Sequence, residues 1–220
     1  MNVRRDNYDD TIEFRNAAAQ AREERQLERL TRIVDVLYAL SLFRTVTDLP
    51  HPTLDDVAAA GSVLGAMRND LPDFLLVVLG VALVAVFWGA NNMMFGNLTR
   101  TDSRHALSSI IQTMCVMMFG YTLRLSNDLG DLPQILAGQS VLLLIGGSMA
   151  VLAWSRARRE GMISGAVGEQ ERDDVARKLL VEPVLAAVTI PLAWVGPIVY
   201  TLAWFVGFPV VRRALKSLGR

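Results

Sequence analysis

The chain has 220 residues, with 22 Lys and Arg against 22 Asp and Glu, and a net charge of +0 at pH 7. Hydrophobic residues make up 52% and charged residues 20% of it, whereas a soluble domain carries about 25% charge. The neutral balance gives no field that attracts nucleic acid, and the single cysteine, Cys115, excludes an internal disulfide and a Cys-based zinc site. The apolar residues lie in long runs, which predicts an all-α integral membrane protein.

The N-terminal segment is charged and lacks the short apolar run of a signal peptide. Residues 11–32, rich in Ala, Glu, Arg, Gln and Leu, are predicted to form a helix that runs into the first span. Glu28 and Arg32 have the i,i+4 spacing of a helical ion pair. We take residues 1–28 as a cytoplasmic helical extension and residues 29–220 as the membrane domain.

Six stretches are predicted to cross the membrane, because a spanning helix needs about 20 mostly apolar residues. The final apolar run is too long for one span and is divided at Gly196-Pro197. In chain order the predicted spans cover residues 33–49, 74–95, 106–123, 132–154, 175–196 and 197–211.

Positive charges fix the predicted orientation. With six spans, 19 of the 22 Lys and Arg lie in the N-terminal segment, in two loops (97–105 and 155–178) and in the C-terminal tail. Cytoplasmic loops are rich in Lys and Arg, so both termini are predicted to be cytoplasmic. A five-span arrangement would place the basic C-terminal tail outside, against this rule.

Residues 51–67, between the first two spans, are predicted to form a short external helix. Pro50 and Pro52 end the first span, and Thr53 with Asp56 has the spacing of a capping box. We interpret this helix as an interfacial segment or a subunit contact.

Motifs of enzymes and of metal or cofactor sites are missing from the sequence, so no enzyme, metal or cofactor is predicted. His51 and His105 are predicted on opposite sides of the membrane and cannot share a metal. Glu182 is the one acid inside the later spans, and we expect it to be buried and hydrogen-bonded. Gly146-Gly147 is expected to allow close helix packing.

The first span is unusual because it carries polar residues, which are costly in lipid and usually face protein or water. Leu40, Arg44 and Thr47 share one helical stripe, with Ser41, Thr45 and Asp48 on the next. A symmetric ring of such helices can hold a central water path, which a single six-span chain cannot. The alternative interpretation is that Arg44 pairs with Asp48 inside the bundle.

Two short stretches resemble the transmembrane protein 175 family of potassium channels. The family's first span begins Arg-x-x-x-Phe-Ser-Asp, and residues 29–35 keep the Arg and the Asp at that spacing, with Ile33 and Val34 in place of Phe and Ser. The family's second span ends near Trp-x-x-His-His-x-x-Phe, and residues 88–95 keep the Trp and the Phe, with Asn91 and Asn92 in place of the two His.

The resemblance, over about residues 29–213, implies a six-span homotetramer whose first span lines a passive, potassium-permeable pore. It implies a hydrophobic constriction at Leu40. Arg44 and Thr47, which share the helical stripe of Leu40, would then lie further along the pore. It also implies a polar network made of Arg29, Asp35, Trp88 and Asn91. We therefore expect a multi-pass protein of the cell inner (plasma) membrane, whose partners are potassium ions, the lipid bilayer and its own copies.

Two alternatives stay open at this point. Arg44 stands where the family has Leu or Thr, so the chain is alternatively an anion-permeable member of the family. A non-conducting membrane scaffold or sensor, whose cytoplasmic helix binds a partner, is the third interpretation.

Overall fold

The computed structural model describes residues 3–47, 49 and 51–217, and for residues 3–16, 72, 73, 75, 76, 79 and 127 it describes the backbone alone. Over these residues the chain is helical, and its single β-type contact is an isolated bridge between two loops. The helices are α1 (Val3–Thr47), α2 (Leu54–Ala60), α3 (Val63–Asn69), α4 (Leu71–Gly96), α5 (Ser103–Leu129), α6 (Pro133–Arg159), α7 (Glu169–Leu192) and α8 (Pro197–Ser217).

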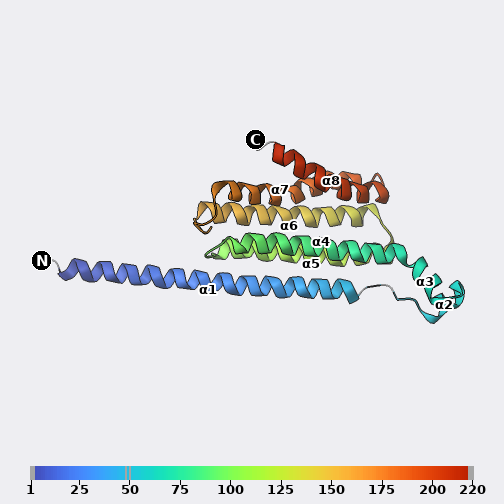
Figure 1. Ribbon diagram of the computed structural model, residues 1–220, viewed down its shortest axis with the longest axis horizontal. Coiled ribbons are helices and arrows are strands. Elements are labelled where there is room, and N and C mark those ends of the chain that lie inside the picture. The colour runs from blue at the N-terminus through green and yellow to red at the C-terminus, as the bar shows by residue number, and fades with distance from the viewer. Residues whose placement is uncertain (1–2, 48, 50, 218–220) are drawn as a thin grey trace.

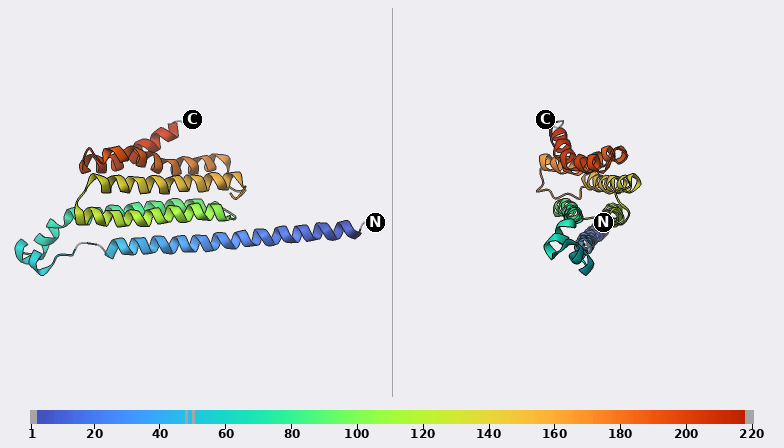
Figure 2. Two further views of the ribbon diagram at one scale, coloured as in Figure 1. Left: turned by 180° about the vertical axis from the view of Figure 1, so that it is seen from behind. Right: turned by 90° about the vertical axis from the view of Figure 1, so that its right-hand side faces the viewer.

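The long helices α1 and α4 to α8 lie side by side and alternate in direction along the chain (Figure 1). Consequently α1 begins and α8 ends toward the same end of the bundle, where the α4–α5 and α6–α7 loops also lie (Figure 2). The helices α2 and α3 lie at the opposite end. The N-terminal part of α1 projects beyond the rest of the bundle.

The predicted continuity of the first helix is confirmed. α1 runs without a break from Val3 to Thr47, so the helix expected over residues 11–32 does continue into the first apolar stretch. Glu28 and Arg32 approach to 3.6 Å on its surface.

The segment predicted to be external contains two helices, so the single helix predicted over residues 51–67 is wrong in that respect. Thr53 begins α2 with the expected capping box, since its hydroxyl accepts from the amide of Asp56 and its amide donates to the Asp56 carboxylate. Gly61 then ends α2 with a left-handed φ of 71°, and Ser62 caps α3 through the amide of Gly65. Glycine adopts that φ without strain, which makes Gly61 the natural point of division.

Each remaining predicted span has a helix at its place. Among the described residues, three helices are long and apolar enough to cross a membrane: α5 over Ser103–Ser126, α6 and α8. A shorter apolar stretch, Gly80–Gly96, lies within α4. The division at Gly196-Pro197 is also found, because α7 ends at Leu192 and α8 begins at Pro197. The full count of six spans stays a prediction.

Gly146 and Gly147 allow α6 to pack closely on its neighbours α5 and α7, as predicted. A Cβ atom added to Gly147 would lie 2.8 Å from Cδ of Pro183 on α7, and one added to Gly146 would lie 3.2 Å from Cβ of Cys115 on α5. The core around this contact includes Trp154, Leu143 and Leu185, which are all at most 2% exposed.

The α4–α5 and α6–α7 loops lie at the N-terminal end of the bundle, the end toward which α1 begins. The isolated bridge between Leu98 and Ile163 joins these two loops. The amide of Thr99 donates to the carbonyl of Met162 at 2.9 Å, and the amide of Ser164 donates to the carbonyl of Asn97 at 2.9 Å. These bonds connect the α4–α5 hairpin to the α6–α7 hairpin.

Candidate functional site

The second half of α1 has two different faces. One face packs into the bundle through Leu30, Val34 and Tyr38, which are all buried. The opposite face is an apolar strip that the described chain leaves uncovered, and we call it the α1 stripe. Its members are Ile33, Val36, Leu40 and Phe43, whose exposed fractions lie between 52% and 68%. A helix that is apolar on both faces is expected where lipid or another protein surface covers the second face.

The three predicted pore residues lie on or beside the α1 stripe. Leu40 is within it, and Thr47 is exposed further along the same face, where its hydroxyl donates to the carbonyl of Arg44 at 2.7 Å. Arg44 is exposed at the flank of the stripe and lines a pocket of about 490 Å³ between α1, α4 and α5, together with Leu40 and Arg124. Asp48, the suggested ion-pair partner of Arg44, lies outside the described residues.

Two hydroxyls of the adjacent polar stripe bond back to their own helix. Ser41 donates to the carbonyl of Leu37 and Thr45 donates to the carbonyl of Ser41, both at 2.9 Å. Such bonds satisfy a hydroxyl one turn back along the helix. The hydroxyl hydrogens of these two side chains are therefore satisfied within α1.

Of the predicted polar network, the structure brings Asp35 and Trp88 together. The indole N–H of Trp88 on α4 donates to a carboxylate oxygen of Asp35 on α1 at 3.0 Å. Arg29 is exposed two turns earlier on α1, and within the described part of the chain no hydrogen bond or ion pair joins it to Asp35.

Asn91, the fourth predicted member, lies deeper in the bundle and bonds to a different residue. Its Nδ2 donates to the hydroxyl of Tyr38 at 2.6 Å, and both residues are at most 2% exposed. Sequence reasoning missed Tyr38. The available signal was its place four residues after Val34 and eight after Leu30, on the inner face of α1.

Glu182 is half-buried rather than fully buried as predicted, and its hydrogen bonding also differs from the prediction. Among the described residues its Oε1 has no hydrogen-bond partner, and the same holds for Oδ1 of Asn91 and Oε1 of Gln112. Cδ of Glu182 lies 3.2 Å from the position of a Cβ on Gly147. Buried acceptors of this kind are usually satisfied by internal water.

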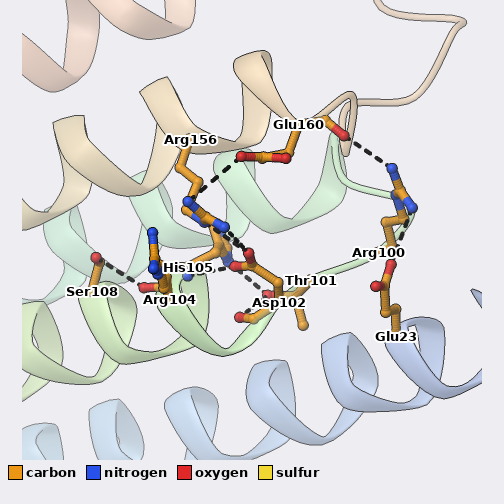
Figure 3. A network of polar contacts seen from close by, with 9 residues as sticks. All are labelled: Glu23, Arg100, Thr101, Asp102, Arg104, His105, Ser108, Arg156 and Glu160. Carbon is orange, nitrogen blue, oxygen red and sulfur yellow. Dashed lines mark hydrogen bonds and ion pairs between the residues drawn. The ribbon is translucent and has the colours of Figure 1, made fainter. Parts of the chain in front are cut away.

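A polar network joins four segments at the N-terminal end of the bundle (Figure 3). Arg156 of α6 donates from Nε to Asp102 at 2.7 Å and also contacts it through Nη2, and it lies 3.6 Å from Glu160. Arg100 of the α4–α5 loop pairs with Glu23 of α1 at 3.1 Å and donates to the carbonyl of Glu160 at 2.9 Å. This network therefore holds the extension of α1 against the loops of the bundle.

Asp102 has two functions within this network. Its carboxylate caps α5 by accepting from the amide of His105 at 2.8 Å. The hydrogen bond from Arg156 holds the pKa of the Asp102 carboxyl below its usual value, against the opposing effect of partial burial. The side chain of His105 is buried beneath this cap, where its Nδ1 lies 2.8 Å from the hydroxyl of Thr101.

Comparison with solved structures places the fold. The chain matches the crystal structure of a lysosomal potassium-selective channel TMEM175 homolog from Chamaesiphon minutus, with a TM-score of 0.69, 17% identity, and coverage of 88% of this chain and 99% of that one. It also matches a variant of the potassium channel MtTMEM175 in complex with a nanobody–MBP fusion, with a TM-score of 0.63, 16% identity, and coverage of 87% and 92%. No protein-family model and no curated protein sequence matches the chain. The resemblance seen in the sequence is thus confirmed at the level of fold, which is that of TMEM175 channel structures.

Proposed function

We propose, from the fold shared with TMEM175 potassium channels, that the chain is one subunit of a passive, potassium-permeable channel. Four copies surround a central axis, and α1 of each copy lines the pore. The observation that carries this proposal is the α1 stripe, an apolar face about three turns long that the described chain leaves more than half exposed. In a ring of four copies the stripes face one another, and each uncovered face becomes buried or lines the axis.

The hydrophobic constriction is assigned to Leu40. It is the member of the α1 stripe nearest the middle of the predicted span, and it is 52% exposed. A ring of apolar side chains in a narrow pore closes it by dewetting, and a wider or wetter ring conducts more. Leu40→Ala is therefore expected to raise conductance and to weaken selectivity.

The proposed topology has six spans, with both termini in the cytoplasm. The proposed location is the cell inner (plasma) membrane. The alternating directions of the long helices and the basic residues at the N-terminal end of the bundle support this topology. Cysteine labelling on a Cys115→Ser background tests it. A cysteine placed at Arg213 should be labelled only from the cytoplasmic side, and labelling from outside would contradict the topology.

The test of function is ion flux through the purified protein in liposomes with potassium, sodium or chloride gradients. We expect selective potassium flux that increases in Leu40→Ala. Val188→Ala serves as the matched control, because Val188 is 53% exposed on α7, away from α1. Absence of flux, together with stable capture of a partner by the α1 extension, would favour the scaffold or sensor interpretation.

Arg44 favours a second candidate, an anion-permeable pore, because it is exposed at the flank of the α1 stripe. If it faces the pore, Arg44→Ala should raise cation flux or lower anion flux with little loss of stability. If it pairs with Asp48 inside the bundle, the same change leaves a carboxylate uncompensated at a cost of about 3–5 kcal/mol. The variant should then express poorly, and Asp48→Asn should partly restore it.

A further inference from the structure

A second pocket, distinct from the one beside Arg44, lies between α4, α5, α6 and α8. Its volume is about 280 Å³. One end is polar and lies near the α5–α6 turn, and the other is apolar and runs between α4 and α8. Binding sites for small molecules typically combine an apolar cavity with a few convergent polar groups.

The polar end offers hydrogen-bond acceptors and a negative charge. Asp131 lies there in the turn after α5, and its Oδ1 accepts the hydroxyl of Ser126 at 2.7 Å. The hydroxyl of Tyr200 lies 3.1 Å from the hydroxyl of Ser140 and 3.5 Å from Oε1 of Gln139. Ser126, Gln139 and Tyr200 are each at most 5% exposed, so these groups belong to the interior of the pocket.

Asp131 carries the charge of this end. Its side chain is exposed at the rim, and among the described residues no cation lies within 4 Å of its carboxylate. The Ser126 hydroxyl has already given its hydrogen to Asp131. A ligand head that satisfies these groups must therefore donate hydrogen bonds and carry positive charge.

The apolar end is lined by aromatic side chains of α8, namely Trp204, Phe205 and Phe208, opposite Leu83 and Val86 of α4. Pro209 also lines the pocket and has no amide hydrogen to give to the Phe205 carbonyl one turn earlier. α8 packs mainly on α7, so the space between α8 and α4 is left for a ligand. A hydrocarbon tail fits the chemistry of these walls.

We propose that this pocket binds an amphiphile with an ammonium head and a hydrocarbon tail, the head at Asp131 and the tail between α4 and α8. The negative rim disfavours anionic heads such as sulfates and phosphates. Binding is measured without any measurement of ion flux, so the test of this pocket is independent of the test of the proposed channel.

Trp204 gives the pocket its own optical reporter. The full-length protein in phosphatidylcholine nanodiscs is titrated with a decylammonium whose tail carries bromine, which quenches nearby tryptophan. We expect saturable quenching that disappears in Trp204→Phe, while quenching of the other tryptophans by bulk partition stays linear and unchanged. Unbrominated decylammonium should compete, and decyl sulfate should not.

Asp131→Asn removes the charge and is expected to weaken binding about tenfold, as for loss of a charge-assisted hydrogen bond. Asp128→Asn is the matched control, since Asp128 is an exposed carboxylate at the same end of the bundle, paired with Arg124 at 3.8 Å. Val86 is 53% exposed, so Val86→Trp can narrow the apolar end of the pocket without filling a packed core. This variant should also weaken binding, and it provides a second test if Asp131→Asn fails to fold.

Three results would overturn the proposal. One is an unchanged affinity in both Asp131→Asn and Val86→Trp. Another is competition by decyl sulfate as strong as that by decylammonium. The third is a disulfide between copies in Val86→Cys on a Cys115→Ser background, because the pocket would then be occupied by a second copy of the chain.

Discussion

The indole N–H of Trp88 on α4 donates a 3.0 Å hydrogen bond to the carboxylate of Asp35 on α1. The two residues are 53 positions apart in the chain, so this bond holds the helix that carries the α1 stripe to its neighbour. Hydrogen bonds to charged groups contribute about 1.5–3 kcal/mol, and partial exposure of both side chains places this one at the lower end.

Trp88→Phe keeps an aromatic ring and removes the N–H donor. We expect a loss of about 1–2 kcal/mol in the free energy of unfolding, measured by thermal unfolding in detergent. Trp194→Phe is the control, because Trp194 is 61% exposed in the turn before α8. Equal stability of the two variants would mean that this bond contributes nothing to the stability of the fold.

Tyr38→Phe removes the buried hydroxyl that accepts from Asn91 at 2.6 Å. Nδ2 of Asn91 then retains only the long contact with the carbonyl of Phe87 at 3.4 Å, and an unsatisfied buried donor costs about 1–3 kcal/mol. Thermal unfolding should show this loss, whereas Tyr121→Phe, at an exposed position of α5, should show none. Combining Tyr38→Phe with Asn91→Leu should recover part of the lost stability, because the unsatisfied donor is removed as well. If the double variant is no more stable than Tyr38→Phe, the unsatisfied Asn91 donor is not the cause of the loss.

Gly147→Ala places a methyl group 2.8 Å from Cδ of Pro183 and should separate α6 from α7. Overpacking of a close helix contact costs about 1–3 kcal/mol. Gly138→Ala, in the same helix with nothing within 4 Å of the added atom, should be neutral or stabilising by up to about 1 kcal/mol. Comparable unfolding temperatures for the two variants would contradict this packing.

The lowered pKa of Asp102, held down by the hydrogen bond from Arg156, makes stability depend on pH. A folded pKa below the unfolded value of about 3.9 means that the stabilisation is complete above that value and is lost as pH falls through the folded pKa. The unfolding temperature should therefore fall as the pH is lowered from about 5 through the folded pKa of Asp102. The fall should be larger in the parent chain than in Asp102→Asn, whose amide oxygen can still cap α5. Asp55→Asn, at an exposed position of α2, should keep the parent profile.

Local features of the fold could be predicted from the sequence, and contacts between distant segments could not. The continuity of α1, the Thr53–Asp56 capping box and the break before Pro197 each depend on neighbouring residues. The division between α2 and α3 at Gly61-Ser62 was also predictable, because a glycine followed by a serine ends one helix and caps the next.

The candidate site was only partly accessible to such reasoning. The motif spacing led to Asp35 and Trp88, which do meet, but it could not reveal that Asn91 bonds to Tyr38, since that depends on how α1 rotates against α4. Periodicity placed Leu40, Arg44 and Thr47 near one face of α1, yet the apolar character of that face became evident only when the buried side of the helix was known.

The central claim, that the α1 stripe lines a pore in an assembly of several copies, is tested most directly at Leu40. Potassium flux is measured in liposomes for Leu40→Cys on a Cys115→Ser background, before and after a positively charged thiol reagent. We expect modification at Leu40→Cys to abolish or sharply reduce flux, whereas modification of Val188→Cys, exposed on α7, should leave it unchanged. Potassium flux that persists when Leu40→Cys is fully modified would contradict the account.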